Sequence, residues 1–293
     1  MPMLCTSYMN NKILDIPDIT THELISSYHD GLKRAVEFVK SKIIGTLTGQ
    51  INLSQKEEAV MGIFLRIHAL ACSLVRLNQK IDFNAVASIT RIIFELLIDL
   101  KLLSSQYTNQ QDLDRFFAFP EVDRYRKAKR IIELQEKHPE LVDYSLLNSS
   151  IRNEFVETSR LKNHIELKVN SLWGKTKKKK LNWPDHWSGA SIRDRIKSFG
   201  PLYEQEYLEV YTLLSSYAHG GNSAYSNLPK EVLEYVYGIS LEYARKMYIE
   251  SLLICSKIFN LKEGIETFTQ TVSFLKDAPK QILIKNVLKK MKE

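Results

Sequence analysis

The sequence is poor in residues that mark tight turns, disulfides and metal sites. Its 293 residues include only 11 Gly and 8 Pro, and its three cysteines, Cys5, Cys72 and Cys255, lie far apart without a CxxC pair. Few Gly and Pro disfavour a β-sandwich and favour long helices. Scattered cysteines exclude a zinc ribbon and a disulfide framework. With an N-terminus that lacks the features of a signal peptide, they predict a cytoplasmic protein.

Catalytic motifs with a defined consensus sequence are absent as well. The sequence contains no Walker loop, no GxGxxG, no HExxH, no di-iron ExxH pair and no GxSxG elbow, which disfavours the enzyme classes built on them. We therefore expect neither a metal nor a cofactor. Long apolar runs are interrupted by Arg66, Arg76, Asp99 and Lys101, so we expect no membrane span.

Helical periodicity is what the sequence has in abundance. Hydrophobic residues make up 44% of the chain, and they recur every three or four positions, as in amphipathic helices. The expected helices cover 21–44, 54–75, 83–104, 112–137, 148–173, 192–199, 204–219 and 229–260, with Ser54 and Ser191 as caps and Pro120 at the start of a new helix. This predicts an all-α, multi-helix bundle: a single helical domain over 18–293 behind a flexible N-terminal arm, 1–17.

One expected helix carries a polar stripe on an otherwise apolar surface. The stripe follows spacings of four, three, four and four, and consists of Asn84, Ser88, Arg91, Glu95 and Asp99. Because an unpaired buried charge is costly, the stripe requires a polar neighbour. Arg91 and Glu95, one turn apart, fit either a structural ion pair that fixes the helix register or a pocket in which Arg91 binds an anion.

A second polar stripe lies on the helix that ends at two glycines, 220 and 221. A histidine in the last turn of such a helix can exchange protons near neutral pH. Alternatively, it only satisfies the carbonyl groups of its own helix end. If the two stripes meet, they form an acid–base or phosphate-handling site. The predicted catalytic residues are then His219, Arg91, Glu95, Ser215 and Ser216.

The longest expected loop combines positive charge with aromatic rings. Six residues, 175–180, include five lysines and are flanked by tryptophans, and the chain has a net charge of +7. Such a loop can contact phosphates and stack bases, although a solvated loop has the same composition. At least one of the two later tryptophans is expected to pack on the core. The residues expected to bind a nucleic-acid substrate are Arg193, Arg195, Trp187, Lys177, Lys178 and Lys179.

Three motifs follow one another in a recognisable order. They are Arg91-Ile-Ile-Phe-Glu95, Trp187-Ser-Gly-Ala-Ser-Ile-Arg193 and Leu214-Ser-Ser-Tyr-Ala-His-Gly220, the last preceded by Tyr211. In this order and spacing they resemble a bacterial family labelled domain of unknown function 5677. The resemblance covers residues 55–260. It implies an all-helical fold and brings no assigned reaction.

The Ser-x-x-Ala-His-Gly ending also resembles the end of HEPN domains, which are helical proteins of toxin–antitoxin and phage-defence systems. Many HEPN domains are metal-independent ribonucleases, in which His transfers protons and an upstream Arg binds the scissile phosphate, often across a dimer interface. His219 matches this pattern. Leu and Ser stand where the Arg is usual, so we hypothesise that Arg91 replaces it, with Arg193 or Arg195 as alternatives.

The HEPN resemblance implies a HEPN-like core with additional helices in a bacterial toxin or antiviral defence protein that cleaves RNA. The implied partners are RNA, a protein partner such as an antitoxin, and a second copy of the chain in a homodimer. The alternative function is a non-catalytic helical module that binds or senses a partner and uses the polar stripes as structural glue. A third is an enzyme acting on a small phosphorylated ligand.

Overall fold

The computed structural model describes residues 21–140, 159–176, 178, 180–218 and 230–261. Within these ranges every regular element is a helix, and the one β feature is an isolated bridge between Lys175 and Leu181. The all-α, multi-helix prediction is therefore confirmed. The predicted arm, 1–17, lies outside the described residues, and the single domain over 18–293 stays a prediction.

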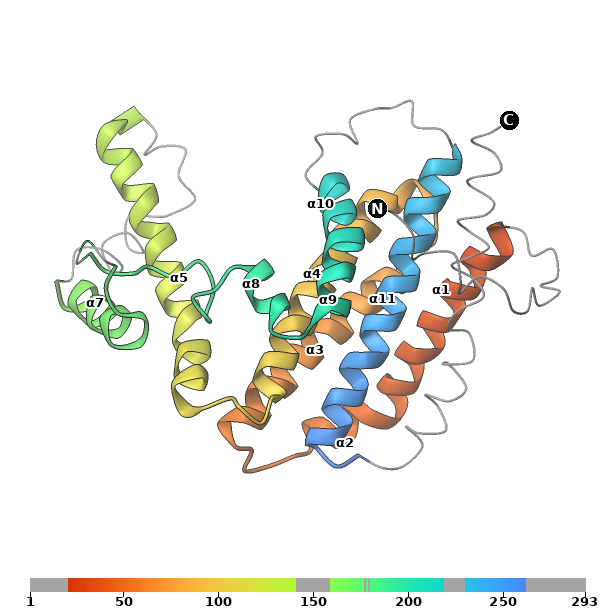
Figure 1. Ribbon diagram of the computed structural model, residues 1–293, viewed down its shortest axis with the longest axis horizontal. Coiled ribbons are helices and arrows are strands. Elements are labelled where there is room, and N and C mark those ends of the chain that lie inside the picture. Colours follow the sequence, from red (N-terminus) through yellow and green to blue (C-terminus); the bar gives the residue numbers. More distant parts are fainter. Residues whose placement is uncertain (1–20, 141–158, 177, 179, 219–229, 262–293) are drawn as a thin grey trace, which may run out of the picture. The chain divides into compact units, whose positions relative to one another are not determined.

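The described residues form two compact units. The first comprises 21–49, 66–94, 211–218 and 230–261, and the second comprises the described parts of 50–65 and 95–210. Two helices contribute residues to both units. These are α3 (Gln55–Arg76) and α4 (Phe83–Ser104), labelled in Figure 1.

The first unit is built on two long helices that are distant in sequence. α1 (Thr21–Phe38) lies along α11 (Lys230–Ile258), as Figure 1 shows. α1 continues through a π-helical segment, Val39–Ile43, into α2 (Ile44–Thr48), so this helical run extends past the predicted end at 44. Apolar side chains with at most 2% exposure line both helices and form the core: Leu24, Leu32, Ala35, Leu241, Ala244 and Leu252.

A buried ion pair belongs to the same interface. Arg245 is 2% exposed, and its Nη2 donates to both carboxylate oxygens of Glu242, at 3.1 and 2.9 Å. A Cβ added to Gly31 would lie 3.0 Å from Arg245 Cδ. The glycine therefore lets α1 approach the aliphatic part of the arginine, which leaves the charged end beside its carboxylate.

α3 begins and ends as the sequence predicts, and its cap is the expected one. Ser54 N–H donates to Glu57 Oε2 at 2.8 Å, and Glu57 N–H donates to Ser54 Oγ at 3.3 Å. The Ser54 hydroxyl also donates to Glu57 Oε2, at 2.7 Å. This hydrogen bond, with a smaller effect of the one from Ser54 N–H, lowers the pKa of the Glu57 carboxyl because it favours the charged form. By length and composition alone, α3 is the one described helix that could cross a membrane, a test that buried core helices also pass.

The second unit has a core between α5 (Gln110–Lys137) and α7 (Ser159–Trp173). The buried residues of this core are Val122, Tyr125, Ile165, Val169 and Trp173. Pro120 lies inside α5, so the prediction that it starts a new helix is wrong. A proline removes one backbone hydrogen bond, and the burial of Val122 and Tyr125 just after it offsets that loss. The helix predicted over 148–173 is described only from Ser159.

A series of short helices joins this core to the last motif. Ser191 caps α8 (Ile192–Lys197) by accepting from Asp194 N–H at 3.2 Å, as predicted. α9 (Pro201–Glu206), a π-helical segment (Tyr207–Tyr211) and α10 (Thr212–Ala218) then follow without a break. The helix predicted over 204–219 therefore starts earlier, at Pro201.

His68, on α3, is expected to make the first unit sensitive to acid. Its Nδ1 lies 2.6 Å from the Tyr248 hydroxyl, and burial, with a smaller effect of Lys40, lowers the pKa of His68 from the ordinary 6.5. The folded chain therefore binds this proton less readily than the unfolded chain. Well above pH 6.5, His68 should not make the free energy of unfolding depend on pH. As the pH falls through 6.5, the unfolded chain binds the proton first and the free energy of unfolding should decrease.

Urea titrations between pH 8 and pH 5 check this expectation. His68→Gln should remove part of the decrease in unfolding free energy below about pH 6.5. Ser73→Ala, a substitution of a non-ionisable side chain on the same helix, α3, is the control and should leave the pH dependence as in the parent. An identical pH dependence for His68→Gln and the parent would contradict the assignment.

Candidate functional site

Arg91 is held against the helical segment that leads into α10. Its Nη2 donates to the Tyr211 hydroxyl at 3.0 Å, and its guanidinium carbon lies 5.0 Å from the centroid of the same ring. The Phe94 ring packs 5.6 Å from Tyr211 on the next turn of α4. A hydrogen bond combined with a cation–π contact holds a guanidinium in one place. The structure thus brings Arg91 of the first stripe to the helix of the second.

The two helices meet along an antiparallel contact. Phe83, at the start of α4, packs edge-on against Tyr217, at the end of α10, with ring centroids 5.9 Å apart. Arg91, further along α4, contacts Tyr211 just before α10 begins. We call this contact, made by 83–94 and 211–218, the α4–α10 seam. All of it belongs to the first unit.

Two buried polar atoms in the α4–α10 seam have no hydrogen-bond partner among the described residues. They are Asn84 Oδ1 and Ser215 Oγ. A buried polar atom without a partner costs about 1–3 kcal/mol, which a ligand atom can recover. Asn84 Oδ1 accepts a hydrogen bond and the Ser215 hydroxyl also donates one. Ser216 differs, since its hydroxyl donates to the Leu213 carbonyl at 2.7 Å.

The other predicted catalytic residues are placed less completely. His219 lies outside the described residues, and in sequence it follows Ala218, the last residue of α10. Glu95 is half-buried one turn after Arg91 on α4 and belongs to the second unit. The catalytic roles of all five residues stay predictions.

Asp99, the last member of the first stripe, has its own partners in the second unit. It accepts from Arg195 Nη1 at 2.5 Å and contacts His186 Nε2 at 3.1 Å. The Arg195 side chain is 7% exposed and that of Asp99 is 14% exposed. Arg195 therefore forms a buried ion pair on α8, while Arg193 on the same helix is exposed.

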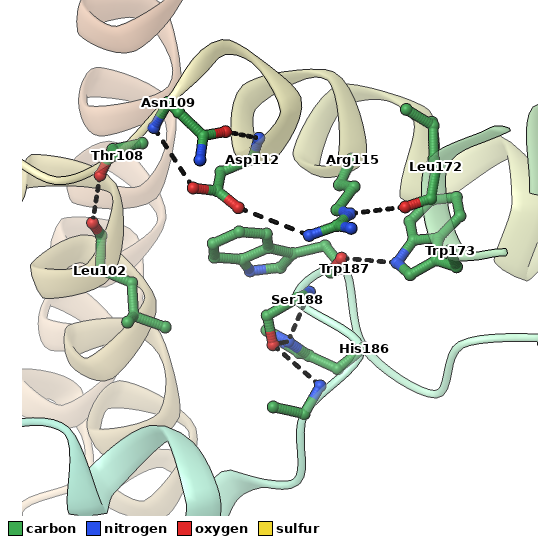
Figure 2. Close-up of polar contacts among 11 residues, drawn as sticks. Leu102, Thr108, Asn109, Asp112, Arg115, Leu172, Trp173, His186, Trp187 and Ser188 are labelled. Atoms are coloured by element: carbon green, nitrogen blue, oxygen red, sulfur yellow. Dashed lines mark hydrogen bonds and ion pairs between the residues drawn. The ribbon is translucent and has the colours of Figure 1, made fainter.

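His186 begins a tight turn that contains part of the second motif. The backbone N–H and the hydroxyl of Ser188 both contact His186 Nδ1, at 3.2 and 2.9 Å, as Figure 2 shows. Trp173 Nε1 donates to the Trp187 carbonyl at 2.9 Å. Gly189 has a φ of 73°, and a Cβ there would lie 3.3 Å from Trp173 Cδ1. Trp187 is 5% exposed, which confirms that one of the later tryptophans packs on the core.

The lysine-rich loop is described in part. Thr176 N–H donates to the Lys180 carbonyl at 2.7 Å, which folds the loop back on itself with Lys178 in the turn. Lys177 and Lys179 lie outside the described residues. The role of this loop in binding a nucleic acid stays a prediction. In the part of the chain that the structure describes, no three His, Cys, Asp or Glu side chains are grouped to hold a metal ion.

The three motifs lie within a match to a known protein family. The model of the family of unknown function DUF5677 matches residues 57–231. The chain belongs to this family. No curated protein and no solved structure matches the chain.

The DUF5677 match contains all three motifs, and the structure shows what they do locally. The first motif supplies Arg91, the second supplies the turn at 187–190, and the third supplies α10. Sequence reasoning missed His186 and Trp173, which hold that turn. The signal for His186 was its place directly before Trp187. Tyr211 stood in the third motif, but nothing in the sequence showed that it would bind Arg91.

Trp173→Phe is expected to loosen the turn without removing the core. Phenylalanine keeps most of the buried ring and loses the N–H that donates to the Trp187 carbonyl at 2.9 Å. Leaving that carbonyl without its donor should lower the free energy of unfolding by about 1–2 kcal/mol. Trp183→Phe, at a half-buried ring stacked 6.0 Å from Tyr125, is the matched control. Urea unfolding should show a larger loss for Trp173→Phe, and equal losses would contradict the role of this hydrogen bond.

Proposed function

We propose that this DUF5677 protein is a HEPN-like bacterial ribonuclease of the toxin or phage-defence type that works without a metal. The observation that supports it is the contact of Arg91 with Tyr211 at 3.0 Å. Tyr211 lies on the same continuous helical run that carries Ser215 and ends one residue before His219. A cation from α4 is therefore held in the α4–α10 seam, against the helical run that His219 follows in the sequence.

Each proposed role follows from the chemistry of RNA cleavage. The 2′-oxygen of the ribose loses its proton and forms a bond to phosphorus. The bond from phosphorus to the 5′-oxygen breaks, and the departing 5′-oxygen gains a proton. His219 would carry protons, because imidazole accepts and donates them near neutral pH. Arg91 would hold the phosphate through its fork of N–H donors, with Glu95 orienting it. Ser215, a buried hydroxyl in the α4–α10 seam, would donate a hydrogen bond.

The alternative is a non-catalytic binding or sensing module. Asp99 supports it, because this member of the first stripe forms a buried ion pair with Arg195 and a contact with His186. A stripe that is engaged in this way fixes the position of a helix without acting on a substrate. On this interpretation Arg91 and Tyr211 also form a structural contact.

Incubation of the full-length protein with a labelled single-stranded RNA in excess EDTA tests the proposal. We expect cleavage that leaves 2′,3′-cyclic phosphate ends, because the 2′-oxygen is the attacking atom. A protein that binds the RNA and leaves it intact would support the binding module instead. Cleavage that stops when EDTA is added would contradict a metal-free reaction.

A further inference from the structure

We propose that Asp99, His186 and Ser188 form a proton relay that makes the Ser188 hydroxyl a nucleophile for acyl transfer from an ester. Asp99 Oδ2 lies 3.1 Å from His186 Nε2, and His186 Nδ1 lies 2.9 Å from Ser188 Oγ. A carboxylate, an imidazole and a hydroxyl in this sequence of contacts have the connectivity of the acid–base–nucleophile triads of acyl-transfer enzymes. All three belong to the second unit, whereas the α4–α10 seam belongs to the first.

The hydrogen bonds assign the proton of the imidazole. Ser188 backbone N–H points at His186 Nδ1 from 3.2 Å. A backbone N–H only donates, so Nδ1 has to be the nitrogen with the lone pair. Nε2 then carries the proton and donates it to Asp99. His186 is thereby in the tautomer that accepts the Ser188 proton, with the two nitrogens exchanged relative to the usual triad.

Two further hydrogen bonds support the first and last residues of the relay, Asp99 and Ser188. Arg195 donates to the other oxygen of Asp99 at 2.5 Å and thereby orients the carboxylate. Ala190 N–H donates to Ser188 Oγ at 3.2 Å. This donor stabilises negative charge that develops on the oxygen as its proton moves to His186.

The turn presents Ser188 on a rigid support. The Trp187 carbonyl is bound by Trp173 Nε1, and Gly189 adopts a φ of 73° with Trp173 close behind it. Ser188 is half-buried, so part of the residue is exposed to solvent. The sequence has no GxSxG elbow. A His-x-Ser-Gly turn positions the hydroxyl instead.

Buried donors near the relay point to a ligand that carries acceptor atoms. Trp187 Nε1 and Arg195 Nε are buried and have no hydrogen-bond partner in the described ranges. Trp187 is 5% exposed and Arg195 is 7% exposed. Their side chains neighbour the relay, because the Trp187 ring lies 5.4 Å from that of His186 and Arg195 binds Asp99. The oxygens of an ester are acceptors that suit such N–H groups.

The reaction needs no reagent other than the ester and water. Ser188 Oγ forms a bond to the carbonyl carbon, its proton moves to His186 Nδ1, and the bond from that carbon to the alkoxy oxygen breaks as this oxygen takes the proton. Water then repeats the steps on the acyl-serine and releases the acid. Asp99 is a positioning residue that acts through His186.

A fluorophosphonate probe tests Ser188 directly in the full-length protein. Attack by Oγ forms a bond to phosphorus and expels fluoride, so intact-mass measurement should show one adduct and peptide mapping should place it on Ser188. Ser188→Ala should abolish the adduct. His186→Gln should slow labelling by about 100-fold, the contribution of a general base. Ser198→Ala, whose hydroxyl donates to the Arg195 backbone carbonyl, is the matched control and should label like the parent.

Folding is checked by circular dichroism at the labelling temperature. If His186→Gln is unfolded there, the parent is labelled with and without denaturing urea, and the relay requires that urea abolish labelling. A folded parent without an adduct on Ser188 would overturn the proposal, and so would labelling of folded His186→Gln at the parent rate. In those cases His186 only supports the turn.

Discussion

Arg195→Met should lower the free energy of unfolding by about 3 kcal/mol or more, because it leaves a buried carboxylate without its main partner. The Asp99 side chain is 14% exposed and that of Arg195 is 7% exposed, with 2.5 Å between the charged atoms. Methionine replaces the aliphatic stem of the arginine with an unbranched apolar chain, so lost packing contributes less than the lost charge. Urea unfolding measured by circular dichroism gives the value.

Two further variants separate the ion pair from other effects. Arg193→Met removes the same charge from an exposed position of the same helix, α8, and should stay within about 0.5 kcal/mol of the parent. Asp99→Leu combined with Arg195→Met removes both charges and should recover most of the loss, because an apolar pair of similar volume replaces a buried ion pair at little cost. A double variant as unstable as Arg195→Met would contradict this explanation.

Arg91→Lys should reduce RNA cleavage by about 100- to 1,000-fold, the usual cost of losing one preorganised donor to a developing negative charge. Lysine keeps the positive charge but lacks the planar fork that reaches Tyr211 and a phosphate together. The measurement is the rate of a single turnover on a labelled RNA with enzyme in excess.

Arg66→Lys is the matched control, because Arg66 is exposed on α3. It should cleave at the parent rate. Both variants should melt within a few degrees of the parent if the effect is chemical. Should Arg91→Lys cleave at the parent rate, another arginine binds the phosphate, and if the variant is unfolded, the contact with Tyr211 is structural.

The fold was largely predictable because local sequence patterns, such as apolar periodicity and capping residues, indicate helices. The bounds of α4 agree with the predicted 83–104, and the caps at Ser54 and Ser191 form as expected. Pro120 was misassigned, because the burial of Tyr125 and Val122 against α7 is a tertiary effect. The same holds for the helical run that begins at Pro201, where only packing decides how far the helix extends.

The candidate site was predictable in its residue types and much less in its pairings. Arg91 and Asp99 lie on one face of one helix, as the spacing requires, but they have unrelated partners. Arg91 binds Tyr211, while Asp99 binds Arg195 and His186. Periodicity states which residues share a face and carries no information on which distant segment covers each part of it. That information comes from three-dimensional packing alone.

The rate of RNA cleavage by His219→Ala, compared with its melting temperature, tests the central claim most directly. The proposed function predicts that cleavage is lost while the variant melts within a few degrees of the parent, because a proton-transfer residue contributes to the reaction more than to stability. Ser73→Ala, whose hydroxyl donates to the Ala69 carbonyl of its own helix, α3, is the control and should retain cleavage. Parent-level cleavage by His219→Ala, or loss of cleavage together with unfolding, would contradict a catalytic role for this histidine.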